Sequence, residues 1–119
     1  MADALIIDPQ SIENLRALNP GDDDEFLREI VGIFFDDTPQ RIAELDQSLL
    51  AGDRPRFTRA AHSIKGSSSN LGATGLQAVA EKLENLVCAQ GMVDVAPLVS
   101  EVKLEYERVH AALTTIIQK

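Results

Sequence analysis

The sequence predicts an all-α fold, an antiparallel up-and-down four-helix bundle with a short N-terminal capping helix. Two observations support this prediction. Apolar residues recur at spacings of three and four in four long segments, and no segment alternates with period two over the length of a strand. Turn residues separate these segments, and Leu, Ile, Val and Ala supply most of the apolar content. At 119 residues, the chain is of single-domain size, so we expect one domain over 1–119.

The first two helices are predicted from capping residues and the apolar pattern. Asp8, followed by proline, predicts an N-cap and a short helix over 9–18. Asp22 is predicted to cap a long helix over about 23–51, with acidic residues at the positive end of its dipole. Pro39 lies inside that helix and removes one backbone hydrogen bond, so we expect a kink there rather than a break.

The last three helices are predicted from similar signals. Asp53 is expected to open a helix that runs to residue 71 and ends at Gly72. Thr74, with glutamine three residues on, resembles a capping box for a helix that Gly91 ends. Asp94 is expected to cap the final helix, in whose first turn a proline is tolerated.

Composition and charge exclude several classes of protein. No apolar run approaches the length of a membrane span, and the start MADALIIDPQ lacks the basic region of a signal peptide, so we expect a cytoplasmic protein. The single cysteine suits a reducing compartment. A net charge of −8 argues against nucleic acid or an anionic membrane as the main partner.

The charge is distributed unevenly along the chain. Residues 1–53 carry −10, whereas residues 54–80 contain no acid and four bases. These bases are Arg54, Arg56, Arg59 and Lys65. An acid-free window in an acidic protein indicates a surface that an anion could occupy, although a solvated surface would look the same.

The window contains a segment that is unfavourable for a helix. Residues 65–70, KGSSSN, cost roughly 3 kcal/mol against alanine in a helix interior. The apolar phase nevertheless continues through them, within about 40° of one direction at 100° per residue. The positions in phase are Phe57, Ala60, Ala61, Ile64, Ser68 and Leu71. We therefore expect one uninterrupted helix here, with functional reasons for its poor helix formers.

The same helical wheel directs a histidine away from the core. With the core direction at zero, His62 points to about 140° and Gly66 to about 180°. Lys65 at about 80°, Ser69 at about 120° and Arg59 at about 200° flank the histidine. Any side chain at Gly66 would crowd the outer side of the imidazole, so this arrangement leaves the imidazole accessible to a large reactive partner.

The stretch AAHSIKGSSSNLGA (60–73) resembles the signature of histidine-containing phosphotransfer domains, His-x-x-Lys-Gly followed by small residues and Leu-Gly. The resemblance implies a four-helix bundle whose exposed histidine accepts a phosphoryl group from a receiver-domain aspartate and passes it to another. It implies that His62 is phosphorylated, that Lys65 lies beside the phosphate, and that Gly66 keeps the receiver's approach clear.

Glu84, 22 residues beyond His62, is similar to a glutamate that orients the imidazole in the phosphorylated domain of chemotaxis kinases. A carboxylate that accepts the Nδ1 proton would leave Nε2 as the nucleophile. The alternative is a solvated surface glutamate. The serines and asparagine after Gly66 instead look more like the phosphorelay group.

Two other side chains are weaker candidates for a functional site. His110 lies beside the apolar stripe of the last helix and is expected to be partly buried or idle. Cys88 is expected to pack as a small apolar residue. Two histidines far apart in sequence do not predict a metal site.

The sequence thus predicts a monomeric phosphocarrier of a two-component phosphorelay, without an ATP site or a cofactor of its own. Its expected partners are response-regulator receiver domains, which would supply Mg²⁺, and a sensor histidine kinase, including the hybrid kind. Two alternatives stay open. One is a chemotaxis-type kinase substrate domain phosphorylated in trans, and the other is a helical interaction module without chemistry.

Overall fold

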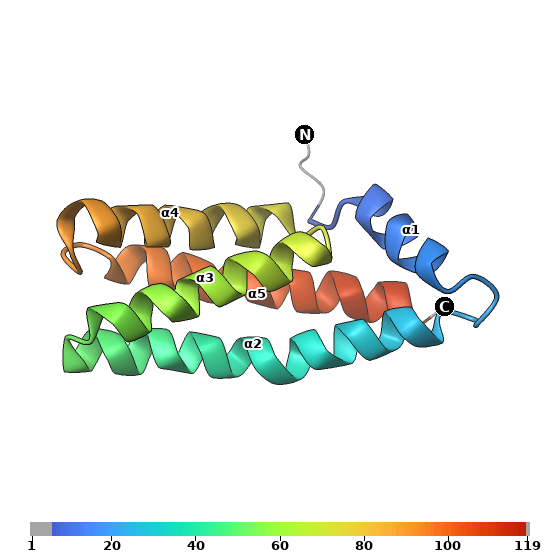
Figure 1. The fold of residues 1–119 in the computed structure, drawn as a ribbon, viewed down its shortest axis with the longest axis horizontal. Coiled ribbons are helices and arrows are strands. Elements are labelled where there is room, and N and C mark those ends of the chain that lie inside the picture. Colours follow the sequence, from blue (N-terminus) through green and yellow to red (C-terminus); the bar gives the residue numbers. More distant parts are fainter. Residues whose placement is uncertain (1–5, 119) are drawn as a thin grey trace.

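The computed structural model describes residues 6–118 and contains five helices (Figure 1). They are α1 (Pro9–Leu18), α2 (Glu25–Ala51), α3 (Arg54–Asn70), α4 (Thr74–Gln90) and α5 (Ala96–Ile117). Helices α2 to α5 run antiparallel in sequence order, and α5 also contacts α2, which closes the four-helix arrangement (Figure 1). Helix α1 packs against α2 at one end of the bundle (Figure 1). The predicted all-α bundle with a short capping helix is confirmed.

The buried face of α3 is the predicted one. Phe57, Ile64 and Leu71 are almost completely inaccessible to solvent, as are the two adjacent alanines. Ser68 is also buried, and its Oγ donates a 2.6 Å hydrogen bond to the carbonyl oxygen of Ile64. This bond satisfies the buried hydroxyl within its own helix, so Ser68 can lie on the core face of α3.

Cap residues agree with the sequence at some ends and differ at others. Asp8 and Asp53 are N-caps, and their carboxylates accept the expected backbone hydrogen bonds of α1 and α3. Helix α2 begins at residue 25, with Asp24 rather than the predicted Asp22 as its N-cap, because Asp23 and Asp24 adopt left-handed backbone conformations. The Asp22 carboxylate still accepts a hydrogen bond from a first-turn amide. The long helix continues through its internal proline without a break.

Two further predicted N-caps are wrong. The capping box at Thr74 does not form, because the N-cap is the buried Ala73 and Thr74 is already the first residue of α4. Likewise Val95, rather than Asp94, is the N-cap of α5. Asp94 instead takes a left-handed conformation, with φ of 60°, in the preceding turn. In both cases a buried apolar residue from the connection occupies the cap position.

Candidate functional site

His62 lies on the solvent side of α3, as the helical wheel predicts. Its side chain is 65% exposed, whereas the neighbouring Ala61 is fully buried. Its Nδ1 lies 2.9 Å from Oε2 of Glu84 on α4. A carboxylate at this position accepts a hydrogen bond from Nδ1–H, so the tautomer it favours carries its lone pair on Nε2. The contact thereby fixes the orientation of an imidazole whose side chain is largely exposed.

Glu84 holds a second side chain of the site. Its Oε1 accepts a 2.7 Å hydrogen bond from the ammonium group of Lys65, and its side chain is only 19% exposed. The hydrogen bond from Lys65, followed in strength by the one from His62, lowers the pKa of the Glu84 carboxyl. In turn, the hydrogen bond to Glu84 raises the pKa of Lys65. Both groups therefore stay charged at neutral pH, and Glu84 links histidine and lysine.

The sequence-based prediction had not identified the contact between Lys65 and Glu84. It placed Lys65 beside the histidine and Glu84 on the imidazole, each as a separate neighbour of His62. The wheel of α3 gives the direction of Lys65 but not the helix that packs beside it, so the contact with Glu84 on α4 appears only in the structure. In the structure, Lys65 already has a carboxylate partner before any phosphate is present.

Gly66 leaves the outer side of the imidazole open. A Cβ atom built at Gly66 would meet no atom within 4 Å, so no packing demand accounts for the glycine. The contrasting case is Gly72, where a Cβ would lie 2.6 Å from the Cβ of Ser11 on α1. Gly72 is therefore required by close packing, whereas no packing contact explains Gly66, which lies one turn beyond His62 on the exposed side of α3.

The remaining residues singled out from the sequence are less closely involved. Ser69 is exposed, and no hydrogen bond of its side chain to another described residue is present. Arg59 is exposed one helical turn before His62. His110 is exposed rather than partly buried, and its ring stacks on Phe35 with centroids 4.2 Å apart. Cys88 is exposed, so the prediction that it packs as an apolar residue is wrong.

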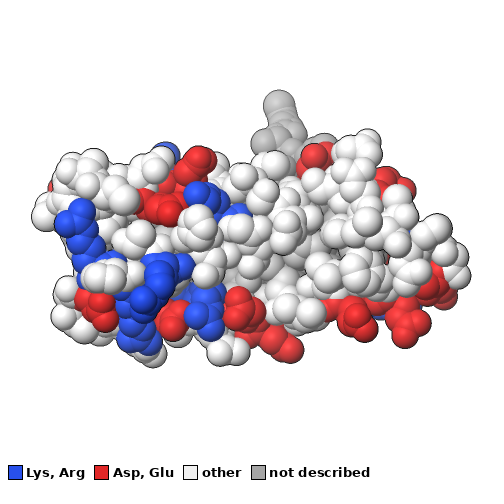
Figure 2. All heavy atoms as spheres, viewed as in Figure 1, with Lys and Arg blue, Asp and Glu red and all other residues white. Residues whose placement is uncertain are grey.

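The bases of the acid-free window lie together on one face of the molecule. Figure 2 shows Lys and Arg side chains gathered where α3 begins, while the end near α1 and the start of α2 is mainly acidic. The end of α3 that precedes the histidine is therefore positively charged in a protein whose net charge is −8. Such a surface attracts anionic groups during encounter.

Within residues 6–118, no group of three or more His, Cys, Asp or Glu side chains is arranged to hold a metal ion. In the same part of the chain, no helix is long and apolar enough to span a membrane.

The fold and the site together define a class of protein: a helical bundle that presents a histidine, oriented by a carboxylate, on an open surface. Residues 29–112 match the family model of the Hpt domain. The chain therefore belongs to the Hpt domain family, and the resemblance seen in the sequence is confirmed.

Two known proteins are similar to this chain. Multistep phosphorelay regulator 1 of Schizosaccharomyces pombe is 31% identical over 99 residues, which make up 83% of this chain and 34% of the relative. The chain thus spans about a third of the length of that curated protein. The crystal structure of histidine-containing phosphotransfer protein B from Pseudomonas aeruginosa PAO1 superposes with a TM-score of 0.85. The sequence identity is 28%, and the match covers 98% of this chain and 97% of that one.

Proposed function

We propose that this protein is a phosphocarrier of a two-component phosphorelay, and that Nε2 of His62 carries the phosphoryl group between receiver-domain aspartates. The observation that carries the proposal is the 2.9 Å contact between His62 Nδ1 and Glu84 in an otherwise exposed imidazole. Membership of the Hpt domain family and the likeness to a phosphotransfer protein support it. Its partners would be receiver domains and a sensor histidine kinase, in the cytoplasm.

The proposed reaction is an in-line transfer between two side chains. The Nε2 lone pair of His62 attacks phosphorus, an N–P bond forms, and the P–O bond to the receiver's aspartate breaks. The aspartate leaves as a carboxylate. The ring gains positive charge as the N–P bond forms, and the Glu84 carboxylate stabilises that charge through the Nδ1 proton.

Lys65 would have two roles in sequence. Before transfer it is bound to Glu84, and as the phosphoryl group arrives its flexible side chain can turn its ammonium group toward the phosphate oxygens. Mg²⁺ would belong to the receiver, which supplies the acidic pocket, while this chain supplies the nucleophile and the cation. In this proposal the chain has no ATP site of its own, residues 1–119 form one domain, and the protein acts as a monomer.

The test is transfer from a panel of phosphorylated receiver domains. The protein should acquire an acid-labile, alkali-stable phosphate, and His62→Gln should abolish the label while leaving the far-UV circular dichroism unchanged. The matched control is His110→Gln, which removes the other histidine and should label normally. Label that persists in His62→Gln and disappears in His110→Gln would overturn the assignment.

A second candidate is a kinase substrate domain of the chemotaxis type, phosphorylated in trans by an ATP-bound kinase domain. The contact between His62 and Glu84 favours it, because the resemblance places an orienting glutamate at this position in those domains. Two results together would select this candidate over the relay. The chain would be labelled by a kinase and ATP without any receiver, and it would then transfer no phosphate to receivers that are not partners of that kinase.

A further inference from the structure

Three of the four cations in the acid-free window are already bound within the chain. Arg54 donates from Nη2 to the carbonyl oxygen of Val87, at 2.7 Å, and to that of Cys88, at the end of α4. Lys65 is bound to Glu84. These two headgroups would have to break existing hydrogen bonds before they could contact a partner.

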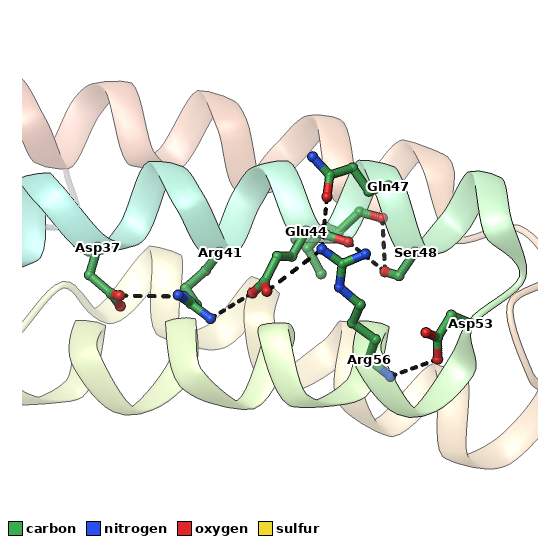
Figure 3. Close-up of polar contacts among 8 residues, drawn as sticks. Asp37, Arg41, Glu44, Gln47, Ser48, Asp53 and Arg56 are labelled. Atoms are coloured by element: carbon green, nitrogen blue, oxygen red, sulfur yellow. Dashed lines mark hydrogen bonds and ion pairs between the residues drawn. The ribbon is translucent and has the colours of Figure 1, made fainter.

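Arg56 is also occupied, by side chains of α2. Its Nη2 donates a 2.8 Å hydrogen bond to Gln47 and lies 3.8 Å from a carboxylate oxygen of Glu44. Figure 3 shows this guanidinium turned toward α2, where Glu44 also pairs with Arg41. Arg56 therefore contributes to the packing of α3 on α2, and its charge is largely offset locally.

Arg59 differs from these three cations. Its side chain is exposed, and within the described residues 6–118 no hydrogen bond or ion pair engages it. The sequence explains why: residues three and four positions away on the helix are Pro55, Arg56, His62 and Ser63, none of them acidic. No intrahelical ion pair is therefore available to Arg59.

Arg59 also lies in line with the proposed phosphorylation site. Arg59, His62 and Gly66 are spaced i, i+3 and i+7, so they follow one ridge of α3. Arg59 is one turn before the histidine, about 4.5 Å along the axis, and Gly66 is one turn after it. A protein that approaches over the open surface at Gly66 meets the imidazole next and the guanidinium beyond it.

We propose that Arg59 is the cation of the acid-free window that docks the receiver domain, by binding a carboxylate at the rim of the receiver's phosphorylation pocket. This inference rests on the proposed function, because it takes the receiver as the partner docked over His62. A guanidinium suits the role, since it binds a carboxylate through two parallel hydrogen bonds. Arg59 would determine how fast the complex forms and how long it lasts, and would take no part in the transfer chemistry.

The test compares Arg59→Gln with Arg56→Gln, both in the wild-type chain and in a His62→Gln background that cannot react. Each substitution removes one positive charge from α3, one turn apart, so any long-range attraction changes almost equally. Association with a fluorescently labelled receiver is measured by stopped flow at low and high salt. Transfer is measured separately by rapid quench, and thermal unfolding shows that both variants remain folded.

Arg59→Gln should slow association roughly threefold to tenfold at low salt and raise the dissociation rate, because contact charges affect both. Arg56→Gln should change either rate by less than about twofold. Equal effects of the two substitutions would mean that Arg59 acts only as distant charge and would overturn the proposal.

The two proposals fail in different ways. If the wild-type chain bound receivers but acquired no label on His62, the proposed function would fail. The comparison of Arg59 with Arg56 would still test which cation contacts the receiver. If labelling were normal and Arg59→Gln bound receivers as the wild type does, only the assignment of Arg59 would fall. Absence of binding to every receiver tested would overturn both.

Discussion

Replacing Glu84 by alanine should change both the tautomer of His62 and the rate of phosphoryl transfer. The substitution removes the acceptor 2.9 Å from Nδ1 and leaves the ring 65% exposed to water. A hydrogen bond to a charged group is worth about 1.5–3 kcal/mol when protected, and exposure reduces it, so we take about 1 kcal/mol. That free energy corresponds to a shift of about fivefold in the ratio of the two neutral tautomers, away from Nδ1–H.

Long-range ¹⁵N–¹H NMR of the imidazole measures the tautomer ratio directly, and rapid-quench transfer measures the chemical step. Transfer by Glu84→Ala should slow at least in proportion to the fall in the population of the Nδ1–H tautomer, because the Nε2–H form has no lone pair on the nitrogen that attacks. The matched control is Glu81→Ala, which removes an exposed acid one turn earlier on α4. An unchanged tautomer ratio in Glu84→Ala, or an equal change in Glu81→Ala, would refute the reasoning.

Three further predictions follow from the same geometry. Gly66→Gln should slow transfer by blocking docking while raising the free energy of unfolding by up to about 1 kcal/mol, whereas Gly32→Gln in α2 should give a comparable stability change and normal transfer. Gly72→Ala should lower the free energy of unfolding by about 2 kcal/mol or more, because its Cβ would lie 2.6 Å from the Cβ of Ser11 on α1 in addition to the strain of a positive φ. Gly52→Ala, whose left-handed backbone has φ of 70° and ψ of 24° but whose Cβ would meet open space, should lose only about 1 kcal/mol in chemical denaturation. Because the pKa of Glu84 is lowered in the folded state, its stabilising contribution is fully present above the ordinary glutamate pKa of about 4.3 and is lost as pH falls from there through the lower native value. Glu84→Gln should therefore flatten the unfolding free energy against pH between about 4.3 and that lower value, measured by chemical denaturation at a series of pH values.

The helices of this protein were predictable because each has a long and regular apolar face. The face of α3 agreed with the structure at every predicted position, from Phe57 to Leu71, even across a glycine and three serines. The ends were less predictable. At Thr74 and Asp94 the side chains are suitable caps, yet the buried Ala73 and Val95 are the N-caps, so packing of the connections overrides the local preference.

The site shows a similar division between local and long-range information. The direction of His62 away from the core and the open space beside Gly66 follow from the geometry of one helix, and both are present in the structure. The ion pair of Lys65 with Glu84 joins two helices, and its existence depends on how α3 and α4 pack, which one helical wheel cannot give. For the same reason, the sequence could not separate Arg59 from the occupied cations around it.

The two faces of α3 have opposite effects on its stability: residues beside the exposed site lower the helix propensity, and buried residues on the core side stabilise the fold. The segment KGSSSN, most of which faces away from the core, loses roughly 3 kcal/mol of helix propensity. The inner face buries Phe57, Ile64 and Leu71, and each such side chain contributes about 1.5–3 kcal/mol on removal from water. Because the free energy gained by burying the inner face exceeds the helix propensity lost in this segment, the helix continues through the glycine without help from its exposed side. The residues beside His62 are thereby free to be chosen for access and charge, so variants of the outer face should change docking and transfer with little effect on folding.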